Sequence, residues 1–143
     1  MAFYVLSSLA GEYLTDRYSR EAAKASGGRG KIEERSRFDG KTSQGKSHRQ
    51  RHWNECMFAA LDLIRNVAGK HNSTEVESAW RWLMHHIKLD VGSGDKAIIG
   101  ASSEKYLEKN LLDFEKGSLP DDVVQALDEV WRMAKGIARS YYH

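Results

Sequence analysis

The sequence of 143 residues is short of several features that mark particular protein classes. It contains no apolar stretch of the ~20 residues that a membrane-spanning helix requires. Its amino terminus has no basic segment followed by a long apolar one, so we expect no signal peptide. A single cysteine, Cys56, excludes an internal disulfide and a cysteine-rich metal site. These absences predict a reducing, cytoplasmic location without a membrane partner.

Charge is unevenly distributed along the chain. Residues 17–52 hold eleven Lys or Arg and four Asp or Glu, a net charge of +7, whereas the remaining residues sum to −5. The same segment has only six hydrophobic residues and five glycines. Because so little apolar surface cannot offset the entropy lost on ordering, we expect residues 17–52 to form a basic, flexible loop.

Apolar spacing predicts two short strands and four helices. The strands are residues 3–6 and 96–99. A first helix follows the apolar face of Trp53, Met57, Ala60, Leu61, Ile64, Val67 and Ala68. A second begins at a capping box of Thr74 and Glu77 and has as its apolar face Val76, Ala79, Trp80, Leu83, Met84 and Ile87.

The other two helices lie near the carboxyl terminus. One is capped by Ser102 or Ser103, ends near Gly117, and should bury Leu107, Leu111 and Phe114. The last opens at Pro120 and should bury Val124, Leu127, Val130 or Trp131, Ala134 and Ile137. The order of strands and helices predicts an α/β fold with parallel strands joined by crossover helices.

Small residues follow each predicted strand. Gly100, Ala101, Ser102 and Ser103 lead into a helix, whose free backbone N–H groups could hold a phosphate. An ordinary serine cap explains the same residues. A second turn, at residues 7–11, follows the first strand. Two such turns at the carboxyl ends of neighbouring parallel strands would place a ligand on one rim of an α/β barrel.

The histidines do not predict a metal site. His85 and His86 are adjacent on a helix, so their side chains diverge by about 100°. His48 and His52 have helical spacing but no nearby carboxylate pair. The sequence shows no motif that pairs a nucleophile with a catalytic base. Residues 48–53 are basic and include one aromatic residue, Trp53. That stretch could bind nucleic acid, although a loop whose arginines meet an anionic ligand explains it more simply.

Several motifs stand together in the order of one known family. They are Leu9-Ala10-Gly11, Ser36-Arg37-Phe38-Asp39-Gly40, Arg49-Gln50-Arg51-His52-Trp53, Trp80-Arg81-Trp82-Leu83-Met84-His85-His86, Asp95-Lys96-Ala97-Ile98-Ile99-Gly100-Ala101-Ser102-Ser103 and Leu107-Glu108-Lys109-Asn110-Leu111. Over nearly its whole length the sequence resembles the C-terminal portion of aldo-keto reductases of the aflatoxin-aldehyde-reductase type, with a fungal character and an implied role in secondary metabolism.

The resemblance implies part of a (β/α)8 TIM barrel that uses NADPH to reduce small carbonyl compounds. Residues 3–6 and 96–99 would be its seventh and eighth strands, in a helix-rich fragment that cannot close the barrel. It implies that the residues contacting NADP are Ser7, Leu9, Ala10, Gly11, Arg37, Gly100, Ala101, Ser102, Ser103 and Asn110. Arg51, together with Arg49 or His48, would face the substrate. The whole chain is then one partial domain: residues 1–16 form a strand and turn, 17–52 the loop, and 53–143 the helices and last strand.

Some positions depart from the family's pattern. Leu6 stands where an aromatic is usual, Ser8 where proline is usual, and Glu12 and Asp16 where glycine is usual. The family's catalytic Asp, Tyr, Lys and His have no counterparts here, so we expect no catalytic residue and little reductase activity from this chain alone. The alternatives are a non-catalytic NADP-binding module and a helical interaction module, which forms a homo-oligomer or completes another barrel. We expect no nucleic-acid partner.

Overall fold

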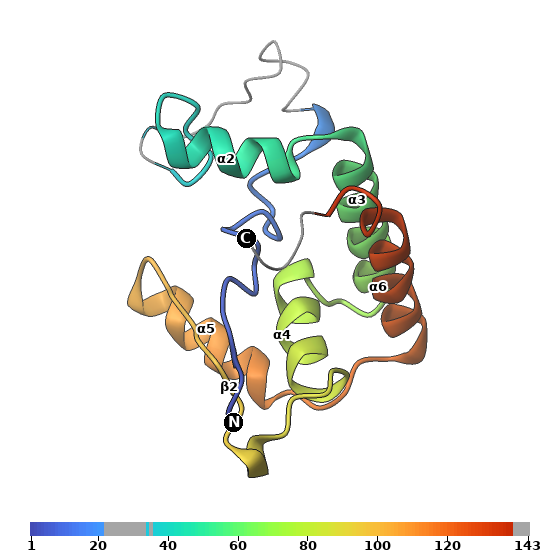
Figure 1. Ribbon diagram of the computed structural model, residues 1–143. Helices are drawn as coiled ribbons and strands as arrows, with labels where there is room; N and C mark the ends of the chain where they lie inside the picture. The colour runs from blue at the N-terminus through green and yellow to red at the C-terminus, as the bar shows by residue number, and fades with distance from the viewer. Residues whose placement is uncertain (22–33, 35, 139–143) are drawn as a thin grey trace.

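Figure 1 shows the computed structural model, which describes residues 1–21, 34 and 36–138. Four of the eleven basic residues in the basic segment, Lys24, Arg29, Lys31 and Arg35, lie outside the described residues. The elements follow in the order β1 (Tyr4–Val5), α2 (Ser43–His52), α3 (Glu55–Lys70), α4 (Glu75–His85), the 3-10 turn η1 (Val91–Ser93), β2 (Lys96–Ala97), α5 (Glu104–Glu115) and α6 (Asp121–Ala134).

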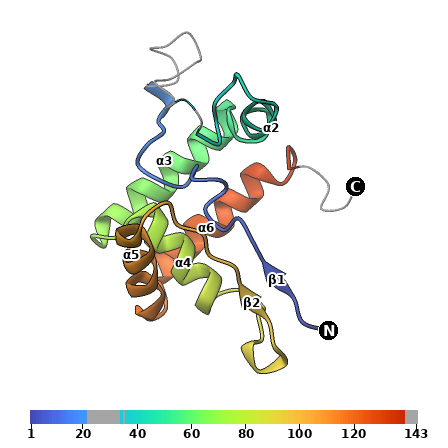
Figure 2. The same ribbon diagram turned by 90° about the vertical axis from the view of Figure 1, so that its left-hand side faces the viewer.

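The two strands pair in parallel, as the sequence predicts. Tyr4 lies opposite Lys96 and Val5 opposite Ala97, and the backbone N–H of Ile98 donates to the carbonyl of Val5 at 2.8 Å. Figure 2 shows the strands side by side, with the helices beyond them. Each strand has two residues rather than the expected four. Within the described part of the chain they form a two-stranded sheet, so the barrel is not closed.

Helices α3, α4 and α6 form the main helical layer. Asn54 and Thr74 cap α3 and α4 through their side-chain oxygens. The apolar face predicted for α3 is confirmed, because its buried residues include Ala60, Leu61, Ile64 and Ala68. Helix α3 lies beside α6 (Figure 1), and the Cys56 thiol donates to the carbonyl of Met133 at 3.2 Å.

The buried face of α5 differs from the prediction. Leu107 and Leu111 are 40% and 47% exposed, whereas Asn110 and Asp113 are buried. The reason is the neighbouring helix: α4 presents the indole of Trp80, whose Nε1–H donates to Oδ1 of Asn110 at 3.1 Å. The prediction for Leu107 and Leu111 is therefore wrong, while Phe114 packs against Trp80 with ring centroids 4.7 Å apart.

The buried stripe of α6 is also displaced from the predicted one. Val123 and Ala126 are its buried residues. Val130 is half-buried whereas Trp131 and Ile137 are exposed, so of the two alternatives Val130 faces the core and the prediction for Ile137 is wrong. The exposed indole follows from helix geometry, because Val123, Ala126 and Val130 have three- and four-residue spacing and Trp131 does not share it.

The prediction of a loop through residues 17–52 is wrong for residues 43–52, which form α2. The hydroxyl of Thr42 accepts a hydrogen bond from the N–H of Gly45 at 2.9 Å and begins the helix. Aromatic packing then holds it, because Phe38 is fully buried and its ring lies 5.5 Å from that of His48. Phe38 belongs to the aromatic core cluster, which consists of Tyr13, Tyr18, Phe38, Phe58 and Leu61.

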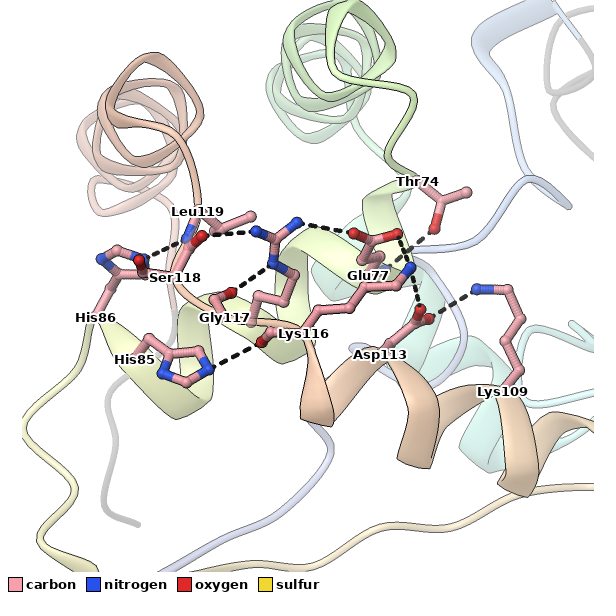
Figure 3. Close-up of polar contacts among 11 residues, drawn as sticks. Thr74, Glu77, His85, His86, Lys109, Asp113, Lys116, Gly117, Ser118 and Leu119 are labelled. Atoms are coloured by element: carbon pink, nitrogen blue, oxygen red, sulfur yellow. Dashed lines mark hydrogen bonds and ion pairs between the residues drawn. The ribbon is translucent and has the colours of Figure 1, made fainter.

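A charged network fixes α5 against α4 (Figure 3). The ammonium of Lys116 lies 2.7 Å from Glu77 and 3.0 Å from Asp113, and Lys109 also pairs with Asp113 at 2.7 Å. Burial raises the pKa of Glu77, but hydrogen bonds from Lys116 and Arg81 outweigh it and hold that pKa below its usual value. Glu77 therefore stays charged, and the carboxylates are compensated although both are nearly buried.

The same network holds the connection between α5 and α6. Arg81 donates to the carbonyls of Gly117 and Ser118 at 2.8 and 2.6 Å. The N–H of Leu119 donates to Nε2 of His86 at 2.9 Å (Figure 3). These contacts give His86 a hydrogen-bond partner, and they fix the connection between α5 and α6 against α4 and its carboxyl end.

Candidate functional site

Two adjoining cavities open at the carboxyl ends of β1 and β2. The large cavity has a volume of about 920 Å³ and the small cavity about 240 Å³. Both are walled by the turn after β1 and the turn after β2. The residues that line both are Leu9, Glu12, Arg17, Gly100, Ala101 and Ser102. The large one is within the size range of ligand pockets, about 300–1,000 Å³.

The turn after β1 has an uncommon backbone. Ser7, Ala10, Gly11 and Glu12 all have positive φ, at 61°, 49°, 68° and 75°. Three of them are not glycine, which costs energy because Cβ crowds the backbone in this conformation. At Gly11 a Cβ would also lie 2.9 Å from Cε1 of His48, so only glycine lets the turn approach α2 this closely.

Two arginines beside a histidine give one side of the large cavity its positive charge. Arg37, His48 and Arg51 all line it, and α2 presents His48 and Arg51 three residues apart on one face. Burial and then the charges of Arg51 and Arg37 lower the pKa of His48. The imidazole is therefore neutral at neutral pH, and the two arginines attract anionic ligands.

Arg49, next to His48 in the sequence, has a structural role. Arg49 donates from Nε to the carbonyl of Phe38 at 2.7 Å, and its guanidinium lies 5.7 Å from the ring centre of Trp53. It is not among the cavity-lining residues. The sequence predicts that either Arg49 or His48 faces the substrate together with Arg51. In the structure His48 lines the large cavity with Arg51, whereas Arg49 does not line it and stabilises the fold.

The turn after β2 forms the opposite wall. Gly100, Ala101 and Ser102 line both cavities, and Asn110 lines the small one. Ser103 lines neither; its hydroxyl accepts from the N–H of Tyr106 at 3.3 Å as the cap of α5. The sequence allows this turn to be either a serine cap or a phosphate-binding turn. Ser103 is the cap, and Ser102 lines the cavities, where a phosphate could bind.

Most of the predicted site residues meet at these cavities. Ser7, Leu9, Gly11, Arg37 and Arg51 line the large cavity from the amino-terminal half of the chain. Ala10 does not line either cavity and packs against the aromatic core cluster instead. The residues thus converge from the two turns and from α2, although they are up to about one hundred positions apart in the sequence.

The wall of the large cavity includes polar groups that lack partners. The hydroxyls of Ser8 and Ser36 and Nδ1 of His48 are buried without a hydrogen-bond partner among the described residues. Unsatisfied buried polar atoms are uncommon in folded proteins and call for an explanation. Because these atoms expose almost no surface, a ligand in the cavity would bond to them only after a local shift of the wall.

The aldo/keto reductase family model matches residues 1–132. This chain belongs to the aldo/keto reductase family. The fold of this family is a TIM barrel, and the two parallel strands described here are consistent with a part of one.

Three relatives illustrate the family likeness. An aldo-keto reductase of Pseudocercospora fijiensis is 44% identical over 99% of this chain and 45% of its own length. The aldo-keto reductase pigE of Monascus ruber is 40% identical over 100% of this chain and 40% of its length. Aflatoxin B1 aldehyde reductase member 2 of Mus musculus is 32% identical over 99% and 38%. The chain therefore spans less than half the length of these curated reductases.

The sequence did not predict one feature of this site. Glu12 and Arg17 form an ion pair of 2.9 Å, and the Arg17 guanidinium lies 6.0 Å from the ring centre of Tyr106. The sequence marked Glu12 only as a departure from the family pattern. A separation of five residues matches neither helix nor strand periodicity, so no local pattern indicates the pair.

Two kinds of feature are absent from the described residues. Within residues 1–21, 34 and 36–138, no three His, Cys, Asp or Glu side chains come together as metal ligands would. Over the same residues, none of the helices has the length and apolar character needed to cross a membrane.

Proposed function

We propose that this chain is the cofactor-binding, C-terminal part of an NADPH-dependent aldo-keto reductase that converts an aldehyde or ketone to an alcohol. In this proposal β1 and β2 correspond to the seventh and eighth strands of the family's barrel. The fungal relatives support a role in secondary metabolism, and we propose a cytoplasmic location.

The observation that carries the proposal is the large cavity between the two strand ends. Its volume of about 920 Å³ suits a dinucleotide, and Arg37 and Arg51 offer charge to anionic groups. The buried, unpartnered hydroxyls of Ser8 and Ser36 lie on residues of the same wall. The two arginines suit an anionic cofactor.

We assign parts of the cofactor to the two turns. Ser7, Leu9 and Gly11 would line the nicotinamide and pyrophosphate. The turn and helix from Gly100 to Asn110, with Ala101 and Ser102, would hold the adenosine 2′-phosphate at the amino-terminal end of α5. Arg37 would contact the cofactor, and Arg51 the carbonyl substrate. The hydride that the carbonyl carbon accepts would come from bound NADPH.

We assign no catalytic acid to this chain. Tyr13 and Tyr18 are buried in the aromatic core cluster, where neither phenol can reach a substrate in the cavity. We therefore expect the purified chain to reduce no simple aldehyde with NADPH. Turnover that disappears in Tyr13→Phe or Tyr18→Phe would contradict this assignment.

Thermal unfolding with and without NADPH tests cofactor binding. Millimolar NADPH should raise the Tm of the wild-type chain, and Ser102→Ala should reduce that rise because its hydroxyl faces both cavities. Ser103→Ala should lower the Tm without ligand as well, since it removes the cap of α5. Ser118→Ala, whose backbone carbonyl keeps its bond from Arg81, is the control. An unchanged Tm at millimolar NADPH would refute the proposal.

A second candidate is a helical interaction module. Leu6 and Ile98 beside the sheet and Leu107 and Leu111 on α5 are exposed, which is uncommon for large apolar side chains that lie near one another. They could be covered by a second copy of this chain or by a complementary part of a barrel. Analytical sedimentation of the purified chain tests the first of these possibilities, because a single monomeric species would contradict the homo-oligomer.

A further inference from the structure

The ion pair of Glu12 and Arg17 lies where the two cavities meet. Both residues line the large cavity and the small cavity. Oε2 of Glu12 is 2.9 Å from Nη1 of Arg17, and the side chains are 34% and 33% exposed. The pair is thus reachable by solvent and by a ligand entering either cavity.

Arg17 also reaches the opposite wall. Its guanidinium lies 6.0 Å from the ring centre of Tyr106 in α5. This contact joins the turn after β1 to the helix after β2, across the space between the two cavities. A ligand that extends from one cavity into the other has to pass this guanidinium.

The backbone places the Glu12 carboxylate at this junction at a cost. Glu12 has φ of 75°, a conformation that glycine adopts without strain. The Thr15 hydroxyl donates to the carbonyl of Glu12 at 2.7 Å and fixes the turn in this shape. The side chain is therefore held beside Arg17 by the turn, and its negative charge stands inside a cavity whose other arginines, Arg37 and Arg51, attract anions.

We propose that Glu12 is an internal competitor for anionic ligands: its carboxylate pairs with the Arg17 guanidinium and places a negative charge where a phosphate of the ligand would bind. An anion that binds at the junction competes with this carboxylate for the guanidinium and is also repelled by its charge. Glu12 thereby lowers the affinity of this site for phosphate-bearing ligands. The inference rests on the proposed cofactor-binding function and assigns Glu12 as a residue that determines its strength.

The test compares binding of NADPH and of inorganic pyrophosphate to wild-type chain and Glu12→Gln. Glutamine keeps the size of the side chain and the strained backbone but removes the charge. Because opposite charges about 4 Å apart are worth about fivefold in affinity even in water, we expect Kd to fall about five- to tenfold for both probes. Raising the salt concentration should shrink the difference.

Two further variants identify the cause. Glu12→Gln should give a smaller tightening in an Arg17→Met background, because the variant then relieves only the repulsion between the Glu12 charge and the anion. Glu129→Gln is the matched control, since Glu129 pairs with Arg132 at 2.6 Å on α6 and lines neither cavity. It should bind both probes as the wild type does. Thermal unfolding without ligand checks that each variant is folded.

The outcomes separate this inference from the proposed function. If wild type and Glu12→Gln bind NADPH equally, within about twofold, the competitor role is overturned and cofactor binding stands. Tightening that is undiminished in the Arg17→Met background also overturns it. If neither binds NADPH, the proposed function fails, and pyrophosphate decides the inference alone: tighter binding by Glu12→Gln supports it, and equal or absent binding overturns it.

Discussion

His52, the last residue of α2, should make the chain less stable as the solution becomes acidic. Its ring stacks on Tyr13 with centroids 5.3 Å apart, and its Nδ1 is buried without a partner among the described residues. Burial, followed by the charges of His48 and Arg51, lowers its pKa from 6.5 to about 4. The unfolded chain therefore takes up a proton before the folded chain does, so stability is lost as pH falls from 6.5 towards 4.

The size of the effect follows from the two pKa values. A folded pKa of about 4 against 6.5 unfolded corresponds to at most about 3 kcal/mol. Because the ring is partly exposed, solvent screening reduces this to about 1–2 kcal/mol. Urea unfolding between pH 7.5 and about pH 4 measures it, with His52→Phe as the variant that keeps the ring stacking but cannot titrate. Equal losses of stability in the variant and the wild type over that range would refute the reasoning.

Two other substitutions, one of them with a control, test the packing around this cluster by urea unfolding. Gly11→Ala should lower the free energy of unfolding by about 1–3 kcal/mol, because φ is 68° and the new Cβ would lie 2.9 Å from His48. The control is Gly69→Ala, in α3 with nothing within 4 Å, which should raise the free energy of unfolding by up to about 1 kcal/mol. A stable Gly11→Ala would contradict the close approach. Tyr13→Phe should stabilise the chain by about 1 kcal/mol, because the buried hydroxyl has no partner among the described residues; a loss of stability would show that the phenol is hydrogen-bonded.

The sequence predicts those parts of the fold that depend on local spacing. Helix α3 has a regular apolar face, and the small-residue turns that follow the two strands indicate where the cavities lie. Helix α2 has no such face. It is held by the Thr42 cap and by rings from Phe38 and Trp53, which come together only in the folded chain. Its prediction as a loop fails for that reason.

The orientation of α5 and the charge pairs at the cavities depend on tertiary contacts. Asn110 is buried because Trp80, thirty residues earlier, donates to it. Asp113 is buried because two lysines compensate its charge. Apolar periodicity assigns the inner face to leucines and cannot anticipate a polar one. The pairing of Glu12 with Arg17 is hidden for a similar reason, since the irregular turn that joins them has no periodic signature.

The pairing of β1 with β2 has a consequence for the order in which the molecule assembles. The two strands are ninety-two residues apart in the chain, as the bond from Phe3 to Asp95 shows, and they share few hydrogen bonds. Closing a chain segment of this length costs about 4 kcal/mol of conformational entropy, which the contacts between the strands must offset. The neighbouring helices α3 and α4 need no such closure, so they can form early. We therefore expect the amino-terminal strand to dock after the helices, and the cavity walls that begin at its end to form with it.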